Sequence, residues 1–317
     1  MKDRFNLYRF ASPATFYPLA GAMIPYFAAV SVLFGLAGLW LGMLVAPTDF
    51  QQGEGYRIIF IHVPASWMSM FIYLVMAFWA AIGLAFNTRL SGMMAQALAP
   101  TGALMAFLSL WTGALWGKPM WGAWWVWDAR LTSELILLFL YIGYMALTAA
   151  IDDARRADKA GGLLLLVGVV NIPIIYFSVK WWNTLHQGSS VNLTKSSMAE
   201  TMLWGMLLMA MCFWMYSIAV AFMRVRTIML ERERHTDWVK AELASIGAGD
   251  EKDNLLCSVE QRIGEGEARL TRRRGGGRPD IHAERVAGHT FDLRKPAPPG
   301  VAQPHGGVCR PGRQHSP

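Results

Sequence analysis

The sequence predicts an all-α membrane protein with six transmembrane helices, on three observations. Of the 317 residues, 54% are hydrophobic and only 16% are charged, whereas a soluble domain carries roughly a quarter charged residues. Six apolar stretches are long enough to cross a bilayer, which takes roughly 20 residues as a helix. The stretches are also too long and too uniformly apolar for the strands of a membrane barrel.

Short loops connect the six apolar stretches, so the spans form one membrane domain over residues 1–230. The predicted spans cover residues 22–46, 64–86, 98–116, 131–151, 163–179 and 199–223.

Basic residues near the span ends predict the orientation, because cytoplasmic loops carry the excess of Lys and Arg. One side holds nine of them: Lys2, Arg4, Arg9, Arg89, Arg155, Arg156, Lys159, Arg224 and Arg226. The other side holds five: Arg57, Lys118, Arg130, Lys180 and Lys195. Both termini are therefore expected in the cytoplasm.

After the sixth span the composition changes. Residues 231–250 are predicted to form a polar cytoplasmic helix, and residues 251–317 a disordered extension rich in Gly, Pro and Arg, with Phe291 as its only aromatic residue. The run RRRGGGRP could bind RNA or anionic lipid, but a solvated tail is the favoured interpretation. No basic surface on a folded domain is evident, so we expect no nucleic-acid partner.

Histidine placement gives the first candidate site. Of seven histidines, only His62 and His186 belong to the membrane region, and both fall on the same predicted side. His62 lies two residues before Pro64, at the predicted mouth of the second span, and His186 lies just past the fifth. Two imidazoles from different helices could hold a haem iron as axial ligands. Interfacial histidines that bond loop carbonyls remain an equal alternative.

Tryptophans gather between the third and fourth spans, in WGKPMWGAWWVWDARLTSE. A helix over residues 121–128 would place Trp121, Trp124, Trp125 and Asp128 on one face, with Trp127 pointing elsewhere. Lying along the membrane surface, it would present a flat aromatic platform to a planar ligand such as a porphyrin, and Trp116 and Trp127 are counted with it among the residues expected to hold that ligand. An ordinary aromatic belt is the alternative, but five tryptophans in one short loop exceed what anchoring needs.

Several polar residues near this segment have competing interpretations. Asp128 is more readily the N-cap of the fourth span than a ligand contact. Arg130 and Glu134 could pair on the helix surface. Arg57 and Arg130 nevertheless lie on the side expected to meet carboxylates, for example the propionates of haem. Pro173 should bend the fifth span, with Asn171 satisfying the freed backbone group.

Three segments carry a family resemblance: WGAWWVWDARLTSE, IHVPASWMSM around His62 and KWWNTLHQGSS around His186. They resemble the CcmC family, the haem exporter C proteins, which belong to the tryptophan-rich haem-handling proteins of cytochrome c maturation. The resemblance covers residues 8–240. The segment after it has no counterpart, and no function transfers to it.

The resemblance implies that haem b is held non-covalently at the periplasmic face of the bacterial inner membrane, with His62 and His186 as axial ligands. It implies delivery to the periplasmic haem chaperone CcmE, alongside the small membrane protein CcmD and the ABC transporter subunits CcmA and CcmB. The chain has no CxxCH for covalent haem and no GxxxxGK[ST] for ATP. We therefore expect a haem-presenting subunit rather than an enzyme.

Two other functions remain as alternatives. A permease that itself moves haem would need polar groups at mid-membrane depth or broken helices, and only residues 171–173 suggest them. An electron-transfer cytochrome b would hold haem deep in the bundle, whereas His62 and His186 are predicted near the surface.

Overall fold

The computed structural model describes residues 12–182 and 198–247, and the elements from α1 to α7 belong to one compact unit that ends at Val239. In chain order its elements are α1 (Pro13–Trp40), the π-helical turn η2 (Leu41–Val45), the 3-10 turn η3 (Glu54–Ile58), α2 (Ile59–Phe86), α3 (Arg89–Trp121), α4 (Ala129–Ala149), α5 (Ala154–Gly168), α6 (Asn171–Trp181) and α7 (Glu200–Arg232). His186 and the predicted tail over 251–317 lie outside the described residues.

Within residues 12–182 and 198–247, six helical segments are long and apolar enough to span a membrane, which confirms the predicted fold class. They are Pro13–Val45, Glu54–Phe86, Arg89–Trp121, Ala129–Ala149, Ala154–Ser178 and Glu200–Arg232. Most extend beyond the predicted spans, because a helix continues past its apolar middle into polar ends. The last one reaches Arg232, where a turn precedes further helix over residues 237–247. The polar helix predicted over 231–250 is therefore interrupted near its start.

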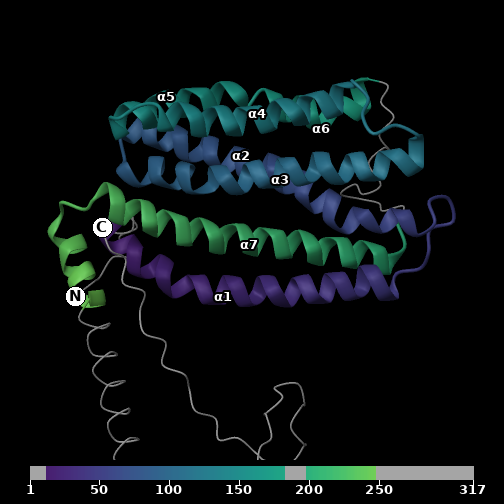
Figure 1. Cartoon of the computed structure of the whole chain (residues 1–317), viewed down its shortest axis with the longest axis horizontal. Coiled ribbons are helices and arrows are strands. Elements are labelled where there is room, and N and C mark those ends of the chain that lie inside the picture. The colour runs from purple at the N-terminus through teal and green to yellow at the C-terminus, as the bar shows by residue number, and fades with distance from the viewer. Residues whose placement is uncertain (1–11, 183–197, 248–317) are drawn as a thin grey trace, which may run out of the picture. The chain divides into compact units, whose positions relative to one another are not determined.

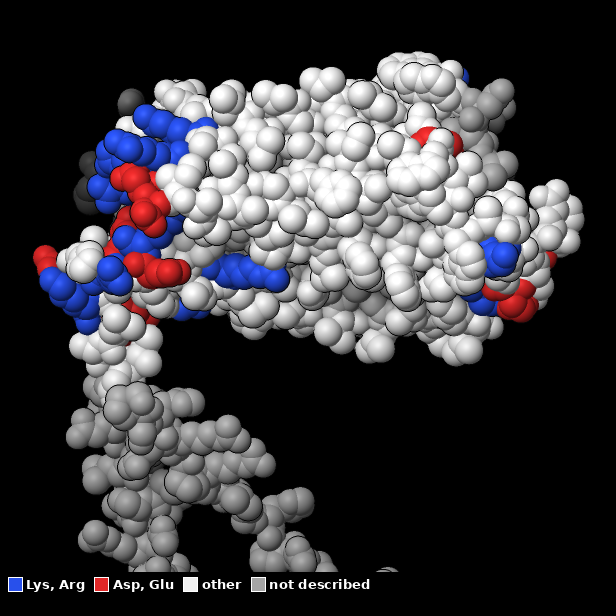
Figure 2. All heavy atoms as spheres, turned by 45° about the horizontal axis from the view of Figure 1, so that its top comes forward, with Lys and Arg blue, Asp and Glu red and all other residues white. Residues whose placement is uncertain are grey.

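The outer surface of the bundle is that of a multi-pass membrane protein. Large apolar side chains such as Leu33, Phe78 and Phe139 are 60% exposed or more, an arrangement that would be a liability in water. Figure 2 shows the charged side chains of this face gathered at its two ends, with an almost uncharged band between them.

The helices form layers (Figure 1). α1 packs along α7, α2 packs along α3, and α4 packs against both α5 and α6 on the other side of the α2–α3 pair. Tyr73, Met105 and Tyr141 are fully buried in the core between these last two layers. A Cβ added to Gly102 would come within 2.2 Å of the Tyr141 ring, so glycine lets α3 and α4 approach closely.

The fifth span is interrupted just before Pro173, where a bend was predicted. α5 ends at Gly168 and α6 begins at Asn171, which puts Pro173 in the first turn of α6, where a missing N–H is tolerated. The role predicted for Asn171 is wrong. Its amide donates to the Ser133 backbone oxygen of α4 (2.8 Å) rather than to a carbonyl freed in its own helix, so it joins two helices.

Candidate functional site

An aromatic cavity of about 710 Å³, partly open to solvent, lies between the start of α2, the end of α3 and the start of α4. We call it the aromatic cavity. Its lining residues are His62, Ser66, Ser109, Leu110, Gly113, Trp116, Gly117, Trp121, Ala123, Trp124, Trp125, Val126, Asp128, Arg130, Leu131 and Glu134.

His62 lies in the wall of this cavity and is only 6% exposed. The 3-10 turn η3 leads directly into α2, so the helix begins at Ile59 rather than at Pro64 as predicted. His62 is therefore inside the first turn of α2. Against it lies Gly113 of α3, where an added Cβ would be 3.1 Å from the His62 Cε1 atom.

The Thr112 hydroxyl restrains His62 through Nδ1. Nδ1 lies 3.0 Å from the Thr112 hydroxyl oxygen, and the same hydroxyl lies 2.5 Å from the Leu108 carbonyl. A Thr112 hydroxyl that donates to Leu108 accepts from His62, which favours the tautomer with the proton on Nδ1 and the lone pair on Nε2. This is the arrangement by which an outer partner orients a metal-binding imidazole.

The tryptophan-rich segment is not the predicted amphipathic helix. α3 continues to Trp121 and ends at Gly122, which has a left-handed φ of 77°, a conformation that favours glycine at a helix C-terminus. Residues 122–128 are non-helical. Asp128 then caps α4 by accepting from the Leu131 N–H (2.8 Å), which confirms its predicted N-cap role.

The tryptophan rings form walls rather than the predicted flat platform. Trp116 and Trp121 are tilted by 55° with centroids 5.6 Å apart. Trp121, Trp124 and Trp125 line the cavity as predicted, although from an irregular loop. Trp127 does not line it: this side chain is 75% exposed and lies edge-on to Trp125.

Trp116 packs against His62 and is itself held in place by a hydrogen bond to Gln52. It is 5% exposed, its ring lies edge-on to His62 with centroids 5.7 Å apart, and its indole N–H donates to Gln52 (2.9 Å). This ring therefore limits the orientation of the imidazole from a second side.

Two buried polar atoms of the lining have no hydrogen-bond partner within the described part of the chain: the Trp125 indole nitrogen and Asp128 Oδ2. Buried polar atoms are normally satisfied, and each exception calls for an explanation. Flat apolar ring faces combined with unpaired polar atoms fit a large amphipathic ligand with polar groups at its edge.

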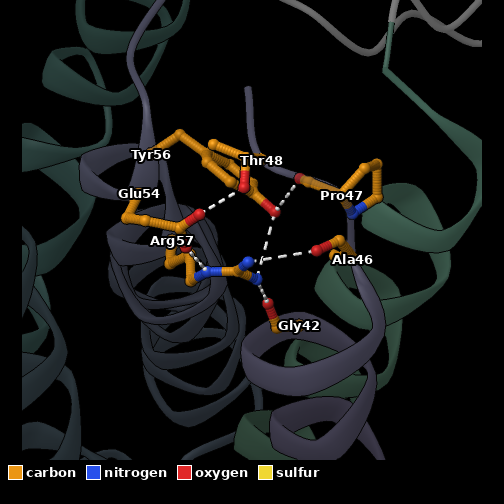
Figure 3. A network of polar contacts seen from close by, with 7 residues as sticks. All are labelled: Gly42, Ala46, Pro47, Thr48, Glu54, Tyr56 and Arg57. Atoms are coloured by element: carbon orange, nitrogen blue, oxygen red, sulfur yellow. Dashed lines mark hydrogen bonds and ion pairs between the residues drawn. The ribbon is translucent and has the colours of Figure 1, made fainter. Parts of the chain in front are cut away.

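The two predicted carboxylate-binding arginines differ in position. Arg130 lines the cavity and is half-buried, and among the described residues its one hydrogen bond is a long one to the Ile175 carbonyl (3.4 Å). Arg57 is outside the lining and has other partners. It pairs with Glu54 and donates to the carbonyls of Gly42 (2.5 Å) and Ala46 (3.1 Å) (Figure 3), so it holds the end of the first span against η3.

Glu134 is buried in the cavity wall, not exposed on the helix surface as predicted. It is 5% exposed and accepts from the Ser69 hydroxyl (2.7 Å), and the described residues show no ion pair between it and Arg130. The helix α4 turns this position towards α2, which periodicity alone did not resolve.

Sequence reasoning did not assign Thr112, Ser66 or Ser109 to the site, and it placed Glu134 on the helix surface. Two signals could have found Ser109 and Glu134. Ser109, Gly113 and Gly117 recur every four residues, which puts three small residues on one face of α3. Glu134 is an ionisable residue in an apolar span, itself a mark of functional sites.

Comparison with known proteins gives a consistent result. The family model described as "Heme exporter protein C" matches residues 6–240. The chain is 47% identical over 239 residues to the heme exporter protein C of Escherichia coli (strain K12), covering 74% of this chain and 95% of that protein. It is 42% identical over 255 residues to that of Bradyrhizobium diazoefficiens (78% and 97% covered). It is also 43% identical over 192 residues to a putative cytochrome c biosynthesis ccmC-like mitochondrial protein of Marchantia polymorpha (61% and 82% covered).

Proposed function

The chain belongs to the heme exporter protein C (CcmC) family of membrane proteins, and on this premise we propose that its aromatic cavity holds haem for transfer to a periplasmic haem chaperone during cytochrome c biogenesis. The observation that carries the proposal is His62: a buried imidazole that is hydrogen-bonded to Thr112 through Nδ1, in a cavity walled by Trp116, Trp121, Trp124 and Trp125.

Within this proposal His62 is one axial ligand of the haem iron, and His186 is the other. Histidine pairs saturate the iron, which suits holding the group rather than oxygen chemistry. The tryptophan rings would contact the macrocycle, and Arg130 would meet a propionate through its guanidinium fork. Haem is cargo in this account: haem b, bound without a covalent link because the chain has no CxxCH.

We further propose that the cavity faces the periplasm across the bacterial inner membrane, with both termini cytoplasmic. The support is the bias of basic residues, which places the fuller set, including Arg89, Arg155 and Lys159, at the other end of the bundle. Partly exposed tryptophans at the cavity rim suit the interface between lipid and water.

The expected partners are the chaperone CcmE, which receives haem, the small membrane protein CcmD and the ABC transporter subunits CcmA and CcmB. In this assembly the chain presents haem and is not an enzyme in its own right. Positioning two reactants can by itself accelerate a step strongly, so the chain would assist haem attachment to the chaperone through geometry.

The decisive experiment is co-expression with the chaperone, followed by staining for haem covalently bound to it. His62→Ala and His186→Ala are expected to lower chaperone loading strongly, and the double variant to abolish it. His235→Ala is the matched control, because His235 is exposed and distant from the cavity lining. Full loading by the double variant would refute the ligand assignment.

One observation favours a permease as the second candidate: the fifth span is broken between α5 and α6, next to the buried Asn171. Discontinuous helices are a feature of transporter sites. Haem-loaded vesicles containing only this chain test this function. Transport without the ABC subunits would favour the permease, and its absence would favour presentation.

A further inference from the structure

A second cavity lies at the opposite end of the bundle from the aromatic cavity, between the end of α2, the starts of α3 and α5, and the end of α7. Its space is about 940 Å³ when the part open to solvent is included, and we call it the basic pocket. Its charged lining residues are Arg89, Arg155, Asp158, Lys159, Arg232 and Glu233. Figure 2 shows the concentration of charged side chains at this end.

Arg232 is fully engaged within this pocket. It donates to both carboxylate oxygens of Asp158 (2.8 and 3.0 Å) and to the Gln96 side chain (2.8 Å). An added Cβ on Gly92 would be 2.2 Å from Asp158, so the absence of a side chain at Gly92 leaves room for this carboxylate. The bidentate pair connects α7, α5 and α3 and offsets the charge of Asp158.

Glu233 is also balanced. It is 8% exposed, lies 3.7 Å from Arg89 and accepts from the Trp238 indole (2.8 Å). With both acidic side chains of the lining accounted for, two cations remain in excess: Arg155 and Lys159.

Arg155 and Lys159 lie one helical turn apart on α5 and line the same pocket. Within the described residues neither makes an ion pair or a side-chain hydrogen bond, and nearby Asp153 is engaged as the N-cap that accepts from the Arg156 N–H. Like charges four residues apart on a helix repel each other. An anion between them would remove this repulsion, and the positive end of the α5 dipole adds to the attraction.

The remaining wall of the basic pocket is apolar and includes Trp79, Leu84 and Leu165. Leu84 is 40% exposed, and Leu163 of α5 is 61% exposed on the outer surface, so an apolar surface continues from the pocket towards lipid. A ligand for this pocket needs an anionic head and a long apolar tail.

We propose that the basic pocket binds the phosphate headgroup of an anionic phospholipid, with Arg155 and Lys159 on the phosphate and the acyl chains along Leu84. Basic pockets between transmembrane helices are a known form of lipid headgroup site. Soluble phosphates share the charge but not the tail, and the apolar wall favours the lipid.

The test is native mass spectrometry of the full-length chain in detergent, titrated with phosphatidylglycerol or with phosphatidylcholine of the same acyl chains. Competitor arms contain glycerol 3-phosphate or inorganic phosphate. The variant is Arg155→Gln with Lys159→Gln. The control, Arg156→Gln with Arg234→Gln, removes the same charge from exposed residues outside the lining. Circular dichroism confirms that both variants fold.

The wild type and the control are expected to retain phosphatidylglycerol in preference to phosphatidylcholine. The variant should bind phosphatidylglycerol about tenfold more weakly, as for the loss of bonds to a charged group. Equal binding of the two lipids, or equal loss in variant and control, would overturn the proposal. Displacement of the lipid by glycerol 3-phosphate or inorganic phosphate at comparable concentration would overturn the lipid as the source of the phosphate.

Discussion

The aromatic cavity and the basic pocket lie at opposite ends of α2 and α3, yet their polar groups are arranged differently. In the basic pocket each acidic side chain has a cationic partner, and two cations are left over. In the aromatic cavity charges are few, a hydrogen bond with Thr112 restrains one imidazole, and two buried polar atoms have no partner in the part of the chain that the structure describes. One end is suited to orienting a large amphipathic group, and the other to attracting an anion.

The largest expected effect is a loss of stability from a change in the basic pocket alone. Arg232→Gln removes the partner of Asp158 and leaves a partly buried carboxylate unpaired, so the free energy of unfolding should fall by roughly 2–3 kcal/mol. Thermal unfolding in detergent measures it. Haem content per folded protein should be unchanged, because Arg232 is outside the aromatic cavity. A parallel loss of haem would mean that the two ends are coupled.

Thr112→Val removes the acceptor that holds the His62 Nδ1 proton while keeping the side-chain shape. Loss of such an outer partner typically weakens metal binding roughly 10–100-fold, and we expect haem affinity to fall within this range in spectroscopic titrations. Thr112→Ser keeps the hydroxyl and should bind nearly as the wild type does. Equal affinities of the Val and Ser variants would contradict the tautomer argument.

Arg130→Gln and Arg57→Gln separate ligand binding from structural support. Arg130→Gln should lower haem affinity about tenfold, since a charge-assisted bond to a propionate is lost. Arg57→Gln should leave haem content per folded protein unchanged but lower thermal stability, because Arg57 donates to Gly42 and Ala46 at the end of the first span. The reverse pattern would make Arg57 the propionate partner.

The smallest expected effect is a loss of stability at the N-cap of α4, beside the aromatic cavity. Asp128→Ala removes the N-cap of α4 and should cost about 1 kcal/mol of stability. Asp128→Asn keeps an oxygen that accepts from the Leu131 N–H, so its unfolding temperature should stay close to that of the wild type. If both variants lose the same stability, the carboxylate charge matters more than the cap.

Residue pattern predicted much of the candidate site because its strongest signals are local. The rarity of membrane histidines singled out His62, and tryptophan density singled out Trp121, Trp124 and Trp125, which line the cavity. The helical interpretation of residues 121–128 failed because Gly122 adopts a left-handed φ and ends α3 there. The spacing correctly grouped the three tryptophan rings that line the cavity, although it assumed a helix where the chain forms a loop.

The sequence by itself determined the six apolar helices, since their length and composition suffice, and it determined that Asp128 caps α4. Only the tertiary structure decided the partners that link separate helices. Thr112 meets His62 because α2 and α3 pack closely at Gly113. Arg57 donates to a carbonyl at the end of the first span, so of the two arginines only Arg130 lines the cavity. The reason is physical: helix formation depends on neighbouring residues, whereas the partner of a side chain depends on which helix faces it.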